Sequence, residues 1–79
     1  MLAVTAADGA RLQLHDGEHR YEVIDGMASW WCQIHGYRNP VLDEAVSRQS
    51  SQFSHVMFGG LTHQAAVDAV KALVDLAPE

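Results

Sequence analysis

The sequence has one cysteine, one lysine and two prolines, and no apolar run of membrane-spanning length. Cys32 has no partner within the chain, so no internal disulfide is expected. A membrane helix needs about 20 consecutive apolar residues, which excludes an anchor of that kind. No charged and apolar leader opens the chain either, and the composition predicts a cytoplasmic location.

Positive charge is scarce as well. Ten acidic residues outweigh five Lys and Arg, which gives a net charge of −5. The cations are scattered along the chain rather than clustered: Arg11, Arg20, Arg38, Arg48 and Lys71. Because binding to a phosphate backbone requires a basic patch, no nucleic-acid partner is expected.

The five histidines and the cysteine form no metal-binding motif of recognisable type. The chain has no CxxC pair and no HxxxH or HExxH on one helix face, so we predict no metal site. Cys32 and His35 could meet on a turn, but no third orienting residue and no oxyanion hole accompany them. Cys32 is therefore interpreted as a small buried hydrophobe.

What is present describes a small globular chain. The apolar fraction is 48% and the charged fraction 19%, which favours a packed core over disorder. A chain of this size buries only about 60% of the surface that its unfolded form exposes, so its stability is marginal. We therefore expect the chain to fold against a partner or a further segment.

The patterning predicts an α+β fold, in which a three-stranded antiparallel β-meander over residues 1–25 precedes two α-helices. The pairs Asp8-Gly9 and Asp16-Gly17 mark tight turns between strands at about 2–6, 11–15 and 20–25. In these strands Leu12 and Leu14 share one face of the sheet, as do Tyr21 and Val23, and the opposite face is wet.

The second half changes to a helical period. Asn39-Pro40 predicts a helix start, because the Asn side chain can cap it and Pro suits the first helical position. The expected order is an aromatic loop at 26–39, a helix at 40–53, a Gly-Gly loop at 54–61 and a second helix at 62–77. Thr62 is the expected N-cap of the second helix.

Two stretches stand out as candidate sites. In the first, Trp30 and Trp31 are adjacent, and neighbours in an extended segment point to opposite sides, so core packing and an outward pocket or interface stay equally open. In the second, Gly59-Gly60 either lets another backbone or a ligand approach closely or simply permits a turn. It lacks the Lys and Ser/Thr of a phosphate-binding loop.

These stretches resemble a known family. The pattern D-x-M-x-S-W-W-x-x-I-H-G-Y is met from Asp25 to Tyr37, and H-V-M-F-G-G-L-T-H is met from His55 to His63. Both are similar to the N-terminal region of class III, fold-type I, pyridoxal-phosphate aminotransferases. Within that family the nearest resemblance is to enzymes of biotin synthesis that convert 8-amino-7-oxononanoate to 7,8-diaminononanoate with S-adenosylmethionine as amino donor.

The resemblance implies roles for particular residues. Trp30 and Trp31 would wall the substrate pocket and offer a flat apolar surface to the alkyl chain of the amino-oxononanoate. A loop formed by Met57, Phe58, Gly59 and Gly60 would reach across a homodimer interface into the neighbouring subunit's active site.

The resemblance also implies what these residues lack. The family needs a Schiff-base lysine, an acid against the pyridine nitrogen, a Gly-Ser phosphate loop and an arginine for the substrate carboxylate. The lone Lys71 lies in the middle of a predicted helix and is interpreted as a surface residue. We therefore expect an N-terminal fragment without the large cofactor-binding domain, with no catalytic or cofactor-binding residue of its own and inactive alone.

The competing hypothesis is a free-standing interaction module that binds a partner, or a second copy, through its exposed aromatic loop. In either case, self-association or a mobile loop at 54–61 is expected.

Overall fold

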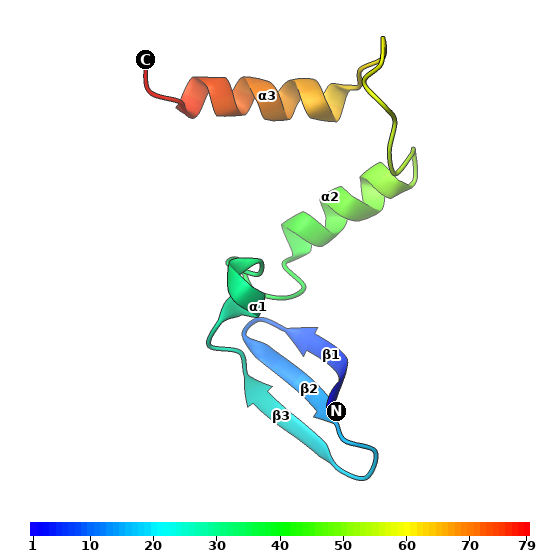
Figure 1. Cartoon of the computed structure of the whole chain (residues 1–79), viewed down its shortest axis with the longest axis vertical. Coiled ribbons are helices and arrows are strands. Elements are labelled where there is room, and N and C mark those ends of the chain that lie inside the picture. The colour runs from blue at the N-terminus through cyan, green and yellow to red at the C-terminus, as the bar shows by residue number, and fades with distance from the viewer. The chain divides into compact units, whose positions relative to one another are not determined.

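The computed structural model describes every residue from Met1 to Glu79 and contains one sheet and three helices (Figure 1). By its internal contacts the chain divides into two units, Met1–Arg48 and Gln49–Glu79. The predicted fold class is confirmed: a three-stranded antiparallel sheet precedes the helices. None of the helices combines the length and the apolar content needed to cross a membrane.

The sheet has the simple strand order β1-β2-β3, with β1 at Ala3–Asp8, β2 at Arg11–His15 and β3 at Arg20–Ile24. Both Asp-Gly pairs lie at hairpin turns, as predicted. β1 extends two residues beyond the expected range, and its pairing with β2 shifts register between Val4 and Ala6.

The predicted apolar face of the sheet is present. Leu12 lies opposite Val23, and Leu14 lies opposite Tyr21. The contrast between a covered face and a wet face is absent, however, because no side chain in the chain is buried. Even Tyr21 and Val23 are 43% and 37% exposed, since no helix of the same unit packs onto the sheet.

Helix α2 (Pro40–Ser50) begins where the sequence predicts. The Oδ1 atom of Asn39 accepts hydrogen bonds from the backbone N–H groups of Val41 and Leu42, at 3.0 and 3.4 Å. This satisfies two of the amides that a helix start leaves without partners. The helix ends before the expected residue 53: the N–H groups of Gln52 and Phe53 both bond to the carbonyl oxygen of Gln49 at 3.0 Å, which forms a turn.

Helix α3 (Gln64–Leu76) lies inside the expected range of 62–77, but its cap differs from the prediction. The N-cap is His63 rather than Thr62, because the His63 Nδ1 atom accepts from the N–H of Ala66 at 3.3 Å. An imidazole nitrogen thus accepts the capping hydrogen bond that a Ser, Thr, Asp or Asn oxygen usually accepts.

Candidate functional site

The two tryptophans lie on a left-handed turn, α1 (Ala28–Trp31). Its residues all have positive φ, of 47°, 48°, 57° and 71° in chain order, and none is a glycine. The predicted loop at 26–39 therefore contains this turn, and the expectation of an extended segment around the tryptophans is wrong. Left-handed backbone costs a non-glycine residue about 1–2 kcal/mol, so other contacts must hold the turn.

The carboxylate of Asp25 provides several of those contacts. Its Oδ2 atom accepts from the Tyr37 hydroxyl at 2.5 Å and from the Ser29 N–H at 2.8 Å, and its Oδ1 atom accepts from the Met27 N–H at 3.0 Å. Because the Tyr37 hydroxyl donates to Asp25, it accepts from the Ser29 Oγ at 2.6 Å. We refer to Asp25, Ser29 and Tyr37 as the carboxylate cluster.

The cluster also fixes the ionisation of its members. The hydrogen bond from Tyr37, followed by the backbone N–H groups of Ser29 and Met27, lowers the pKa of Asp25 below 3.8. The same carboxylate raises the pKa of Tyr37 above 10.0. At neutral pH the cluster therefore holds a charged carboxylate and a protonated phenol.

A pair of backbone hydrogen bonds ties this segment to the turn between β1 and β2 (Figure 1). The Gly9 N–H donates to the Tyr37 carbonyl at 3.0 Å, and the Tyr37 N–H donates to the Gly9 carbonyl at 2.8 Å. Gly36 makes this approach possible: its φ is 81°, and a Cβ atom there would lie 3.3 Å from the Gly9 carbonyl oxygen. A hollow of about 220 Å³ remains between the two segments, with Asp25 and Ala28 in its lining.

The indole rings themselves project into the open. Trp30 is 73% exposed and Trp31 is 78% exposed, so in this chain neither belongs to a core. Cys32 is also exposed, and its thiol contacts the Trp30 carbonyl oxygen at 3.8 Å. The interpretation of Cys32 as a buried hydrophobe is wrong, because its side chain is exposed and no residue of the chain is buried.

The second candidate segment, Met57 to Gly60, lies before α3. Met57 and Phe58 are 64% and 63% exposed. Gly60 has a φ of 78°, and nothing lies within 4 Å of the position that a Cβ atom would take there. The neighbouring Gly59 would meet only the Met57 sulfur, at 3.8 Å. The loop therefore presents bare backbone between two large apolar side chains and the start of the helix.

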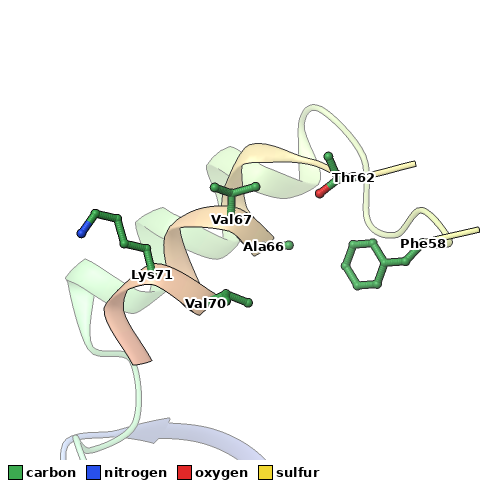
Figure 2. A pocket seen from close by; sticks show the side chains of 6 residues that line it. All are labelled: Phe58, Thr62, Ala66, Val67, Val70 and Lys71. Carbon is green, nitrogen blue, oxygen red and sulfur yellow. The ribbon is translucent and has the colours of Figure 1, made fainter. Parts of the chain in front are cut away.

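The side chain of His63 organises this segment. Its ring stacks on Phe58 with centroids 5.6 Å apart, and it meets the edge of Phe53 at 5.4 Å. Phe58 in turn faces α3 across an open hollow of about 480 Å³ (Figure 2). The hollow is lined by Phe58, Thr62, Ala66, Val67, Val70 and Lys71.

The structure also bears on metal binding and on Lys71, both of which were considered from the sequence. No three His, Cys, Asp or Glu side chains group closely enough to hold a metal ion. The side chain of Lys71 is 73% exposed and donates to Asp75 at 2.6 Å, as one surface ion pair of α3.

Comparison with known proteins decides the family. The family model for aminotransferase class-III matches residues 1–79, which is the whole chain. The chain belongs to the class-III aminotransferase family. The resemblance inferred from the Trp-Trp and Phe-Gly-Gly patterns is thereby confirmed.

Several curated relatives of this class-III aminotransferase chain carry the name adenosylmethionine-8-amino-7-oxononanoate aminotransferase. The protein of Saccharomyces cerevisiae is 49% identical over 77 residues, which cover 96% of this chain and 16% of the relative. That of Buchnera aphidicola subsp. Baizongia pistaciae is 46% identical over 77 residues, or 98% of this chain and 17% of the relative. The protein of Corynebacterium glutamicum is 48% identical over 73 residues, which cover 92% of this chain and 16% of the relative. The chain thus spans only about a sixth of the length of these relatives.

Sequence reasoning missed the role of the carboxylate cluster. Asp25 and Tyr37 entered only as members of a family pattern, without a structural task. A local signal was present, because an Asp side chain readily accepts from the N–H two residues ahead, as Asp25 does from Met27. The bond from Tyr37, twelve residues on, had no such signal.

Proposed function

We propose that these residues form part of an aminotransferase that converts 8-amino-7-oxononanoate to 7,8-diaminononanoate, with S-adenosylmethionine as the amino donor in biotin synthesis. The observation that supports this best is 43–49% identity over nearly the whole chain to relatives of that name. The cytoplasmic location expected from the composition stays a prediction.

In this enzyme Trp30 and Trp31 would form part of the substrate-binding wall. Their exposure supports this role, since large aromatic side chains left open on a fixed backbone provide a ready apolar contact surface. The amino-oxononanoate offers a matching alkyl chain. Burying apolar surface is worth about 25 cal/mol per Å², so two indole faces can supply much of the binding energy.

The loop Met57, Phe58, Gly59 and Gly60 would serve a second subunit. We propose that it contacts the neighbouring active site of a homodimer. Its exposed Met57 and Phe58 supply apolar contacts, and the open positions at Gly59 and Gly60 allow close approach of another chain.

Pyridoxal 5′-phosphate, the cofactor of class-III aminotransferases, does not fit the residues present here. When bound, this cofactor would be held by a lysine that forms a Schiff base with its aldehyde. The one lysine, Lys71, is exposed on α3 and paired with Asp75. We therefore assign cofactor attachment to other parts of the enzyme, and we assign substrate contact to residues of this chain.

A graft tests the proposal. The matching segment of the Corynebacterium glutamicum relative is replaced by this chain, and formation of diaminononanoate is measured with amino-oxononanoate and S-adenosylmethionine. An active graft is expected, with KM for the amino-oxo acid raised in Trp30→Ala and Trp31→Ala. The control is Val41→Ala, an equally exposed apolar residue of α2.

Two results would count against the proposal. One is a folded, dimeric graft that does not transaminate this substrate, in both the Corynebacterium host and the Saccharomyces host. The other is an active graft in which the tryptophan variants match Val41→Ala, which would remove the tryptophans from the substrate wall.

A further inference from the structure

The left-handed turn α1 presents a physical problem, because consecutive strained residues persist in a chain without a buried core. Its own backbone bonds are few: the N–H groups of Trp31, Cys32 and Gln33 donate to the carbonyl groups of Met27, Ser29 and Ala28, at 3.1, 3.3 and 2.9 Å respectively. A strained backbone of this kind persists only where the surroundings over-determine it, and such sites are enriched in binding and catalytic regions.

The hydrogen bonds of the carboxylate cluster hold the turn in this strained conformation. The Asp25 carboxylate accepts hydrogen bonds from the backbone N–H of Met27, directly before the turn, and of Ser29, within it. It also accepts one from the Tyr37 hydroxyl. Tyr37 is itself held by its pair of backbone bonds to Gly9. The carboxylate therefore links the strained turn to the sheet, which is the most regular part of this unit.

We propose that Asp25 and Tyr37 are positioning residues for substrate binding, which hold α1 in its left-handed form and so fix the surface that Trp30 and Trp31 present to the amino-oxo acid. The proposal rests on the proposed function of the two tryptophans. Neither Asp25 nor Tyr37 touches substrate in this scheme. They act by removing the conformational freedom that the indole rings would otherwise lose on binding.

The chain offers a matched control for this proposal. The Tyr21 hydroxyl donates to the Asp16 Oδ2 atom at 2.8 Å, in the loop between β2 and β3. Tyr21→Phe thus removes a tyrosine-to-aspartate hydrogen bond of the same kind as Tyr37→Phe does, but at a site that does not contact α1.

The first measurement uses the chain itself. Trp30 and Trp31 are its only tryptophans, so the near-ultraviolet circular dichroism of indole reports on α1 alone. We expect Asp25→Asn and Tyr37→Phe to remove at least half of this signal, and Tyr21→Phe to leave it unchanged. Ser29→Ala keeps the backbone N–H bond to Asp25 and loses only the hydroxyl, so a smaller decrease is expected.

The second measurement uses the active graft. Misplacing binding groups by about 1 Å can cost up to about 100-fold, so we expect kcat/KM for the amino-oxo acid to fall by roughly 10- to 100-fold in Asp25→Asn and Tyr37→Phe. The loss should lie mainly in KM, because these residues take no part in the chemical step. Tyr21→Phe should retain wild-type values.

The outcomes separate this inference from the proposed function. An unchanged indole signal in Asp25→Asn and Tyr37→Phe overturns the inference, whatever the tryptophans do. A lost signal with unchanged KM also overturns it, provided that Trp30→Ala raises KM. If Trp30→Ala and Trp31→Ala leave KM unchanged as well, the proposed substrate wall is wrong, and the positioning role for substrate falls with it.

Discussion

Replacing Ala28 by glycine tests whether α1 is a left-handed turn rather than an ordinary right-handed helix. In the right-handed helix α2, Ala45→Gly should destabilise the helix by about 1 kcal/mol, as it does in helix interiors generally. Ala28 has a φ of 47°, a region that glycine enters without steric penalty. Ala28→Gly should therefore relieve backbone strain in the turn, whereas Ala45→Gly destabilises the helix.

The magnitude follows from three contributions. Relief of left-handed strain at Ala28 is worth about 1–2 kcal/mol. The greater freedom of glycine in the unfolded chain costs about 0.4–1 kcal/mol, and loss of a half-buried methyl group costs about 0.4 kcal/mol. The net effect of Ala28→Gly lies between roughly neutral and about 1 kcal/mol of stabilisation. The difference from Ala45→Gly is then about 1–2 kcal/mol.

Amide hydrogen exchange measures this difference without requiring global two-state unfolding. The Gln33 N–H donates to the Ala28 carbonyl at 2.9 Å and so reports on the turn, while the amides of α2 report on the control. A change of 1 kcal/mol alters exchange about fivefold. We expect Gln33 exchange in Ala28→Gly to stay constant or slow by up to about fivefold, and α2 exchange in Ala45→Gly to accelerate about fivefold.

The reasoning would be refuted by equal acceleration at both sites. That result would mean that glycine is as unfavourable at Ala28 as in a right-handed helix, so that the turn carries no left-handed strain in solution. A backbone coupling constant for Ser29 in the unsubstituted chain provides an independent check on positive φ.

Three further predictions concern the contacts around the two candidate segments. Because hydrogen bonding lowers the pKa of Asp25 in the folded chain, these bonds stabilise the turn above the ordinary carboxyl range and are lost as the pH falls through the lowered pKa; the indole signal should disappear in that acidic range. In Tyr37→Phe, the midpoint of the remaining indole signal should move upward, because the largest cause of the shift is removed. His63→Ala should lower the helical circular dichroism of α3 by removing a cap worth about 1 kcal/mol, whereas His63→Asn should retain it; equal losses would exclude capping by the side chain. Gly36→Val should abolish the protection of the Gly9 amide, because its Cβ would press on the Gly9 carbonyl at 3.3 Å; unchanged exchange of that amide would show that the two segments do not meet.

The elements with local chemistry were predictable from the sequence. Asn39 followed by Pro40 marks the start of α2, and Asp16 followed by Gly17 marks a hairpin turn, because in each case the asparagine or aspartate side chain bonds to amides within three residues. The facing of Leu12 and Val23 follows equally from the two-residue period of strands. Each of these predictions needed only neighbours in sequence.

The left-handed turn was not predictable by the same means. Ala28 and the three residues after it have no glycine or asparagine that would favour positive φ, so local preference points the other way. The conformation depends on Tyr37 and Gly9, which are distant in sequence, and on the one carboxylate that links them to the turn. Capping of α3 by His63 rather than Thr62 was missed for a related reason, since the aromatic contacts to Phe53 and Phe58 orient the imidazole.

The combination of a fixed backbone with exposed rings is what distinguishes α1 from an ordinary surface loop. Flexible aromatic side chains lose conformational entropy when a ligand binds, whereas rings on a backbone already held in place lose less. The strain of α1 is therefore compensated by the hydrogen bonds of Asp25 and Tyr37, without any bound ligand. On this reasoning the family pattern from Asp25 to Tyr37 describes one structural device: the tryptophans provide the surface, and the two ends of the pattern hold it in position.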